Sequence, residues 1–463
     1  MPFILGTNSI KDTGYDVANS LRFNSGSSDR LNRTLGTPTN NLKWTYSFWI
    51  KRSKLGEEVA ITEAINNSQN KGLILFRSDD QLEIIDLISD SYAMQKKTNR
   101  KFRDVSAWYH IVFSNDSTVG SPDLKIYVNG VEETSLATDN EYSQNQAGSF
   151  NSALANHIGA SASSRFSNCY FSEFVFIDGQ ALDPTSFGEF DSDSPTIWKP
   201  IDVSGLTFGN NGFYLDFEDS SALGNDAAGS NNFTVNNLTA IDQTTDTCTN
   251  NFATMNPLET SPNAVVFSEG NLEVVGSGGN GGRITLGTFA LNSGKWWCEV
   301  KMLNVNGSYP IVGIIDSQSS LKMDAVYFVD SGQDANNRSG YAVFSNSDIY
   351  NNGDNNFGDF GTTYTTNDII GVGLDMDAST PTLTFQKNGS NEVTVTTEVP
   401  PSGFYNFPAI GFYFANAKVS VNFGNPAYTI SSGNTDANGY GNFEYAPKSG
   451  YYACNTKNLA EFG

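Results

Sequence analysis

The carboxylates that could perform acid–base chemistry stand in two short stretches of the sequence. Glycoside hydrolysis on a β-sheet needs two acids that face one cleft, and residues two apart along a strand share a face. Glu83 and Asp86 are three apart, so a regular strand points them to opposite faces. Asp375 and Asp377 share a face, but they end a strand before a turn, where carboxylates commonly accept backbone hydrogen bonds. We therefore expect no glycosidase pair in either stretch.

The two histidines, His110 and His157, are the next candidates for catalysis. A Ser-His-Asp triad needs a histidine that is exposed in a cleft and held by a fixed partner. His110 lies in a segment that is apolar on both strand faces, and His157 directly precedes Ile158. Both positions favour a buried structural histidine, so we expect that the protein is not an enzyme.

Two further stretches stand out by composition. The glycine-rich run 276–282 lacks the Lys-Ser/Thr of a phosphate-binding loop and indicates a flexible hairpin turn. The densest basic stretch, Gln95–Arg103, contains Lys96, Lys97, Arg100, Lys101 and Arg103. It is either a solvated strand or loop, or a docking patch for an acidic neighbouring subunit.

Charge and hydropathy exclude two classes of partner. The chain has 463 residues and a net charge of −23, although only 17 % of its residues are charged. Nucleic acid binding needs Lys/Arg stripes to neutralise phosphates, and this balance disfavours it. No run of about 18 apolar residues occurs, so we expect no membrane insertion. Neutral sugars, cationic surfaces and protein partners remain compatible with this composition.

Cysteine usage and the N-terminus bear on the compartment. Cys169, Cys248, Cys298 and Cys454 are far apart and form no CxxC pair, which favours free thiols in a reducing compartment. The N-terminal Met1–Asn8 lacks the basic and apolar regions of a signal peptide. We therefore expect a protein that is not exported by a signal peptide.

Alternating apolar residues predict an all-β protein. In Thr45–Ile50 the residues Tyr46, Phe48 and Ile50 share a face, as period two requires for a half-buried strand. Further along, Asn129-Gly130 supplies the positive φ angles of a type I′ hairpin turn. Strands of this kind, separated by turn residues, indicate antiparallel β-sandwiches.

The first half of the chain resembles a LamG-like, concanavalin A-type jelly roll. The resemblance lies in Ser20–Asn24, Tyr46–Lys51, Trp108–Val112 and Lys125–Gly130, with Ile158–Ala160 and Tyr170–Gly179 as closing strands. Two later segments, Gln180–Gly188 and Asn251–Pro257, resemble those that follow this jelly roll in structural proteins of marine bacteriophages. The resemblance implies a jelly-roll domain over residues 1–200, followed by connector strands over 201–262 that pack on it.

The second half resembles a SPRY (B30.2-type) β-sandwich. The resemblance lies in Gly294–Val300, Asp368–Asp377, Thr382–Gly389, Phe407–Gly411 and Val419–Gly424. It implies a SPRY-like domain over 263–425 and leaves 426–463 as an irregular C-terminal tail. We expect its core to contain Trp296, Val300, Ile370, Val372, Leu374, Leu383, Phe385, Val419, Val421 and Phe423.

Together the two resemblances imply a binding protein. We expect a non-enzymatic phage virion protein, a tail-fibre or other appendage subunit that contacts host-surface glycan or other virion subunits. Such a protein is assembled in the host cytoplasm as a homo-oligomer, and phage fibres are commonly trimeric. A capsid-decorating or head-fibre protein is an alternative, and a polysaccharide depolymerase is opposed by the missing carboxylate pair.

The resemblance also suggests where ligands bind. SPRY-like sandwiches bind with loops on one edge, and tyrosine with asparagine suits the CH faces and hydroxyl edges of sugar rings. The candidate ligand-binding residues in the stretch 330–364 are Arg338, Tyr341, Tyr350, Asn351 and Asp354. The alternative is that Tyr341 and Tyr350 are packed inside the sandwich.

A possible cofactor, Ca²⁺, is suggested only by the resemblance to LamG-like folds. LamG-like folds often hold Ca²⁺ through aspartate and carbonyl oxygens in loops. The candidate ligands here are Asp79, Asp80, Asp116 and Asp123.

Overall fold

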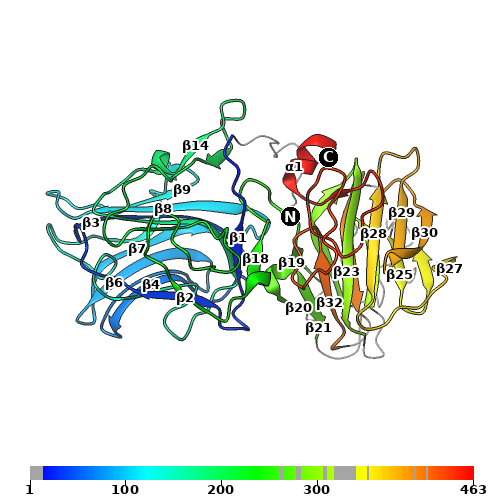
Figure 1. Ribbon diagram of the computed structural model, residues 1–463, viewed down its shortest axis with the longest axis horizontal. Helices are drawn as coiled ribbons and strands as arrows, with labels where there is room; N and C mark the ends of the chain where they lie inside the picture. Colours follow the sequence, from blue (N-terminus) through cyan, green and yellow to red (C-terminus); the bar gives the residue numbers. More distant parts are fainter. Residues whose placement is uncertain are drawn as a thin grey trace. The chain divides into compact units, whose positions relative to one another are not determined.

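The computed structural model describes residues 14–260, 265–277, 283–305, 310–317, 340–351, 354–400, 402–412 and 415–463. It forms two compact units, Thr13–Thr249 and Asn250–Gly463, which we call the first and the second sandwich (Figure 1). Strands account for 48 % of the structure and helices for 4 %. The prediction of an all-β fold with two antiparallel sandwiches is confirmed.

The first sandwich consists of two antiparallel sheets. One sheet runs, in spatial order, through β10 (Val131–Glu132), β9 (Lys125–Val128), β8 (Trp108–Asp116), β3 (Lys43–Arg52), β13 (Cys169–Asp178), β1 (Ser20–Phe23) and β18 (Gln243–Thr244), and β16 (Phe213–Leu215) also pairs with β13. The other runs through β11 (Leu136–Asn140), β7 (Ser91–Lys101), β6 (Gln81–Ile88), β5 (Asn70–Phe76), β4 (Val59–Asn67), β12 (Ala155–Ile158), β2 (Arg30–Thr34) and β17 (Thr234–Asn236). Short accessory elements are β14 (Gly188–Phe190), β15 (Trp198–Pro200) and the 3₁₀ turns η2 (Pro184–Ser186) and η3 (Ala240–Asp242).

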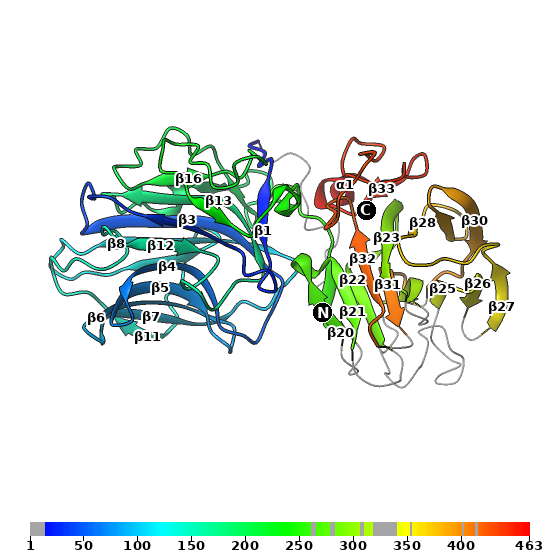
Figure 2. The same cartoon turned by 60° about the horizontal axis from the view of Figure 1, so that its bottom comes forward.

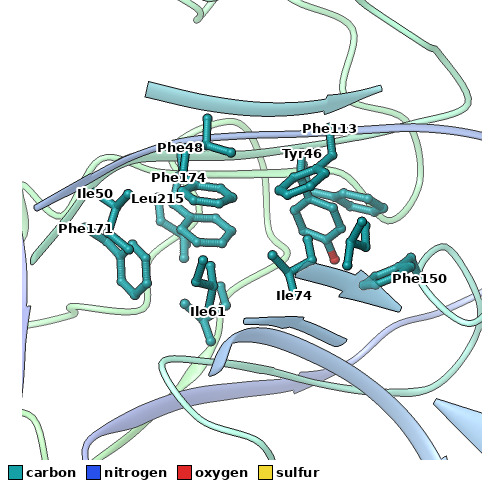
Figure 3. Packing of buried hydrophobic residues seen from close by; sticks show 14 of the residues in the cluster. Tyr46, Phe48, Ile50, Ile61, Ile74, Phe113, Phe150, Phe171, Phe174 and Leu215 are labelled. Carbon is teal, nitrogen blue, oxygen red and sulfur yellow. The ribbon is translucent and has the colours of Figure 1, made fainter. Parts of the chain in front are cut away.

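Aromatic rings from the central strands fill the first core. Tyr46, Phe48 and Ile50 on β3 point into it, as their alternation predicts (Figure 3). Phe48 stacks on Phe174 of β13 with ring centroids 4.9 Å apart. Beside Phe174, β13 carries a bulge at Glu173, whose φ is 48°. A bulge shifts the phase of a strand, so Phe171 and Phe174 both reach the core although they are three apart.

The expected connector is divided between the two units. Its strands β16, β17 and β18 pair with β13, β2 and β1 of the first sandwich. From Asn250 onward the chain belongs to the second sandwich, where β19 (Met255–Thr260) pairs with β22 (Arg283–Leu291). In the structure the first unit therefore extends through Thr249.

The second sandwich also has two sheets. One runs through β19, β22 (Arg283–Leu291), β31 (Tyr405–Phe412), β24 (Pro310–Asp316), β25 (Gly340–Phe344), β26 (Asp348–Asn351) and β27 (Asp354–Asp359). The other runs through β20 (Val265–Ser268), β21 (Glu273–Gly276), β32 (Lys418–Asn422), β23 (Lys295–Asn304), β28 (Ile369–Asp375), β29 (Thr382–Lys387) and β30 (Ser390–Thr396), with the 3₁₀ turn η4 (Glu269–Asn271) before β21. All ten predicted core residues of this half lie in one buried cluster between the sheets, which confirms the predicted register.

The C-terminal segment, residues 426–463, docks on the second sandwich. Its strand β33 (Tyr452–Ala453) pairs in parallel with β23, and the helix α1 (Thr456–Phe462) follows (Figure 2). Asn455 caps α1 by accepting the N–H of Asn458. The ring of Tyr452 stacks on that of Phe462 with centroids 3.8 Å apart. Among the residues that the structure describes, no helix is long and apolar enough to cross a membrane.

Candidate binding sites

Tyr341 is a core residue and is not available to a ligand. It lies on β25 with 1 % of its surface exposed, inside the main core of the second sandwich. Its hydroxyl accepts the N–H of Glu398 at 2.8 Å, and its ring meets Phe357 edge-on at 5.4 Å. Tyr341 is therefore packed inside the sandwich, as the alternative interpretation of the sequence predicted.

Tyr350 and Asn351 remain candidate ligand contacts. Tyr350 is half-buried on β26, and its ring lies 4.1 Å from that of Phe344. The two rings belong to a second apolar cluster, separate from the main core, that also contains Ile284, Leu286, Ile311, Ile315, Ala342 and Ala409. Next to it, Asn351 Oδ1 is buried and accepts no hydrogen bond among the residues that the structure describes. Asn351 pairs with Asp354 of β27, whose side chain lies outside the described part, as does all of Arg338.

The four aspartates proposed for Ca²⁺ are separated into ion pairs. Asp80 is buried and accepts from Arg52 at 3.1 Å, from Arg103 at 2.8 Å and from the N–H of Gly56 at 2.9 Å. The neighbouring Asp79 accepts instead from Lys97 at 2.7 Å. Both carboxylates are thus engaged by cations of the same chain.

The other two candidates are neutralised elsewhere in the first sandwich. Asp116 pairs with Lys43 at 2.8 Å. Burial alone would raise the pKa of Asp123, but Lys125 and Lys96 lower it to about 2. Among the described residues, no group of three or more His, Cys, Asp or Glu side chains is placed to hold a metal. Each of the four aspartates is bound by a different lysine or arginine in this structure, and a Ca²⁺ site at them stays a prediction.

Three cations of the basic stretch on β7, Lys96, Lys97 and Arg100, form ion pairs with acids of the same sandwich. Lys96 is almost fully buried, and its Nζ contacts Asp123 at 2.9 Å, Asp139 at 3.0 Å and also Glu141. Arg100 pairs with Glu133 at 2.6 Å. A hollow of about 180 Å³ lies here, and its lining is Lys96, Asp123, Leu124, Lys125, Ile126, Glu132, Glu133, Thr134, Leu136 and Asp139. Lys96 and Lys125 in this lining are thus both paired with acids of the same sandwich, and the acids outnumber them.

The acids of β6 have structural partners. As predicted, Glu83 and Asp86 point to opposite faces. Asp86 is buried and accepts from the Tyr142 hydroxyl at 2.6 Å and from the N–H and hydroxyl of Ser149. Glu83 faces away from the core and is bound by Arg77 and, at 2.8 Å, by Gln95.

Glu63 on β4 is a buried acid that the sequence pattern did not reveal. It lies opposite Leu73 of β5. Leu75, two residues further on β5 and on the same face, lies opposite Glu83 of β6, so Glu63 and Glu83 are on one face of the sheet. Burial raises the pKa of Glu63, and its carboxylate accepts from Ser161 at 2.7 Å. A register shift between Ala60 and Thr62 breaks the alternation that would have identified its face. Glu63 and Glu83 share a face, but Glu83 is already held by Arg77 and Gln95.

His110 is a buried structural histidine, as predicted. Its ring stacks on Trp49, with centroids 4.8 Å apart. Trp198 Nε1 donates to His110 Nδ1 at 2.9 Å, so Nε2 carries the proton and donates to Ser47 at 2.9 Å. Burial lowers the pKa of His110 to about 3. Because Nδ1 is occupied by an indole and not by a carboxylate, the serine and histidine do not form a triad.

Each sandwich also has a buried glutamate on one of its long strands that binds peripheral segments and that the sequence did not single out, Glu173 and Glu299. Glu173 accepts from the Tyr214 hydroxyl at 2.7 Å and from that of Tyr15 at 3.3 Å. Glu299 on β23 accepts the N–H of Glu444 at 3.0 Å and that of Tyr445 at 2.7 Å. Burial raises the pKa of both glutamates to about 7. Both side chains fasten peripheral segments to a central strand.

Comparison with known families agrees with this architecture. Residues 24–184 match the model of the concanavalin A-like lectin/glucanases superfamily, and residues 295–426 match that of the SPRY domain. The chain thus carries a concanavalin A-like domain followed by a SPRY domain. These domains support a binding or adhesion role, and no catalytic family is indicated. No curated protein matches the chain.

Several solved structures are similar at low identity. The SPRY domain of human HERC1 is 20 % identical, with 36 % of this chain and 96 % of that chain covered and a TM-score of 0.27. Domains LG4-5 of the mouse laminin alpha1 chain are 12 % identical, with 89 % and 92 % covered and a TM-score of 0.31. The heptameric SAP-like pentraxin of Limulus polyphemus is 17 % identical, with 36 % and 79 % covered and a TM-score of 0.27.

Proposed function

We propose that this chain is a non-enzymatic adhesion subunit of a bacteriophage particle. It belongs to a tail fibre or another appendage, and its sandwiches contact host-surface glycan or neighbouring virion subunits. The segments Gln180–Gly188 and Asn251–Pro257, which resemble those of marine phage structural proteins, support the virion assignment. All four cysteines are free thiols, which fits assembly in a reducing host cytoplasm.

The state of the acids carries the non-enzymatic part of the proposal. A retaining or inverting glycosidase needs one free carboxylate and one acid that can protonate a leaving group. Here Glu83 is bound by Arg77 and Gln95, and Asp86 is turned into the core. A second sandwich of a recognition family on the same chain favours adhesion over turnover.

The proposed ligand contact is at β26, the strand beside the edge strand β27 of the second sandwich. Tyr350 offers an aromatic face, which suits the CH face of a sugar ring. Asn351 turns to the opposite face of β26, where its buried Oδ1 accepts no hydrogen bond among the described residues. Replacing Arg338, Asn351 and Asp354 together by Ala should reduce adsorption or assembly. A matched control replaces Asn67 and Gln69, two exposed residues of the first sandwich. If adsorption and assembly both survive the triple change, ligand contact occurs elsewhere.

Incubation with host polysaccharide tests adhesion against depolymerase activity. We expect the protein to retain the polysaccharide in a pull-down and to release no new reducing ends. New reducing ends that grow with time and enzyme concentration would contradict the proposal and favour a depolymerase.

A capsid-decorating or head-fibre protein with the same two domains is the second candidate. Its binding chemistry would be the same, so biochemistry on the isolated chain does not distinguish the two. Images of particles that carry a labelled copy of the chain do, because the label lies on the tail in one case and on the head in the other.

A further inference from the structure

Two cysteines of the second sandwich occupy neighbouring positions on paired strands. β33 runs parallel to β23, with Trp296 opposite Tyr452 and Trp297 opposite Ala453. The next residue on each strand is a cysteine, Cys298 on β23 and Cys454 after β33. Paired strands lie about 4.8 Å apart, and a disulfide spans Cα atoms that are about 4.4–6.8 Å apart. The spacing therefore permits a bond between the two sulfur atoms.

Both thiols also lie on the same face of this ladder. Trp297 and Ala453 belong to a small apolar cluster with Phe252, Phe443 and Tyr451. Side chains alternate along a strand, so the following residues turn to the opposite side. There Cys298 and Cys454 lie together in the main core, each without exposed surface. Cys454 Sγ is 3.8 Å from the carbonyl oxygen of Trp297, directly beside Cys298.

We propose that Cys298 and Cys454 form a latent disulfide that fixes the C-terminal segment to β23 when the protein meets a small oxidised disulfide. The Cys454 thiolate attacks one sulfur of that disulfide, forms a mixed disulfide and expels one thiolate. The Cys298 thiolate then attacks the Cys454 sulfur and expels the second. Two protein thiols are oxidised, one small disulfide is reduced, and the two leaving thiolates take up the two protons that the cysteines lose. This inference does not depend on the proposed adhesion function.

Burial controls when the bond forms. Both thiols are inaccessible, and burial raises the pKa of each, so neither reacts while the C-terminal segment is docked. Opening of the segment would carry Cys454 out to the small disulfide, and redocking would return its sulfur to Cys298. Asp436 holds this segment by accepting the N–H of Ala453 at 2.8 Å and Asn458 Nδ2 at 2.7 Å. Weakening that contact should make opening, and therefore oxidation, faster.

Thiol counting and peptide mapping of the full-length chain test the bond. The reduced protein is incubated with oxidised glutathione at pH 8, quenched with iodoacetamide and digested. We expect the denatured protein to lose two of its four thiols and to yield one linked pair of peptides that contain Cys298 and Cys454. Four remaining thiols, glutathione adducts alone, or a different cysteine pair would overturn the proposal.

Matched variants make the test specific. Cys454→Ser should abolish the linked peptides, and Cys169→Ser, which removes a buried cysteine of the first sandwich, should leave them unchanged. Asp436→Asn should raise the oxidation rate several-fold, and an unchanged rate would overturn the requirement for opening. The wild-type chain supplies a readout that needs no variant: its second sandwich should unfold at a higher urea concentration when oxidised, and dithiothreitol should reverse the shift. No such shift would contradict fixation of the segment.

Discussion

Glu173 of the first sandwich and Glu299 of the second are both buried acids, and different groups donate hydrogen bonds to them. Both are buried on a central strand, and burial raises the pKa of both to about 7. Glu173 is bound by the hydroxyls of Tyr214 and Tyr15. Glu299 is bound most closely by the backbone N–H groups of Glu444 and Tyr445, and Asn422 Nδ2 and the Tyr428 hydroxyl donate to it at 3.2 and 3.4 Å. At Glu173 the printed side-chain donors are hydroxyls, whereas at Glu299 the path of the C-terminal backbone supplies the two shortest bonds.

The raised pKa values make both sandwiches sensitive to pH in the same direction. An unfolded glutamate titrates near 4.5 and a folded one with a pKa of about 7 holds its proton longer. Between these pH values the folded state binds more protons than the unfolded state, so stability falls as pH rises. At neutral pH each glutamate lowers stability by about 3 kcal/mol relative to its protonated form. The penalty is fully present above the folded pKa and absent below the unfolded one.

The largest expected loss of unfolding free energy follows from removing a core ring, and it should be confined to the sandwich that carries the ring. Phe385→Ala removes a ring without exposed surface from the second core, which should cost about 3–5 kcal/mol. Phe174→Ala is the matched change in the first core. Hydrogen exchange under urea should show β28 destabilised by the first change and β3 by the second. A loss under about 1 kcal/mol for Phe385→Ala would mean that its place in the core is wrong.

A charge-removing change at Glu299 should flatten the pH dependence of the second sandwich. Glu299→Gln keeps a carbonyl acceptor for the amides of the C-terminal segment but cannot ionise. Urea unfolding between pH 4.5 and pH 7 should lose the fall in stability of about 3 kcal/mol that the wild type shows. Glu173→Gln should leave that slope of the second sandwich in place. An unchanged slope in Glu299→Gln would contradict the raised pKa.

Tyr214→Phe tests the side-chain donor at Glu173. The change removes a hydrogen bond to a buried acid, and an unsatisfied buried group costs about 1–3 kcal/mol. The loss should be largest at high pH, where Glu173 is ionised, and urea unfolding at pH 5 and pH 8.5 measures the difference. Tyr127→Phe, at a half-exposed tyrosine of the same sandwich, is the control and should change stability little at either pH. An equal loss at both pH values would mean that Tyr214 does not bind the carboxylate.

The smallest expected effect concerns an exposed ion pair. Arg103 contacts Asp80 at 2.8 Å, but 56 % of its side chain is exposed. Such pairs contribute about 0–1 kcal/mol, so Arg103→Ala should shift the urea midpoint of the first sandwich only slightly. Arg52 binds the same carboxylate with 2 % exposure, and Arg52→Ala should cost clearly more. Equal losses would mean that burial does not set the strength of these pairs.

Local patterns predicted the fold because they act over a few residues. The alternation of Tyr46, Phe48 and Ile50 identified a core-facing strand. Asn129-Gly130 identified a hairpin, and both residues have positive φ, 48° and 77°. In the second sandwich, alternation around Ile370, Val372 and Leu374 identified the central strand β28.

The functional residues could not be predicted in the same way. The two closest donors to Glu299 are backbone groups far along the chain, and a backbone N–H leaves no signature in the sequence. Glu63 follows a register shift that breaks period two. Tyrosine is a residue type that suits sugar binding, yet the side chain of Tyr341 points into the core. The four aspartates were grouped by residue type, whereas the fold places a different cation beside each.

The composition of purified phage particles tests the central claim most directly. Quantitative mass spectrometry of particles freed of host lysate should detect this chain at a fixed number of copies per particle, in a multiple that fits an oligomeric appendage. The number should not fall on further purification. Absence of the chain from infectious particles, or a copy number that declines towards zero with each purification step, would contradict the account.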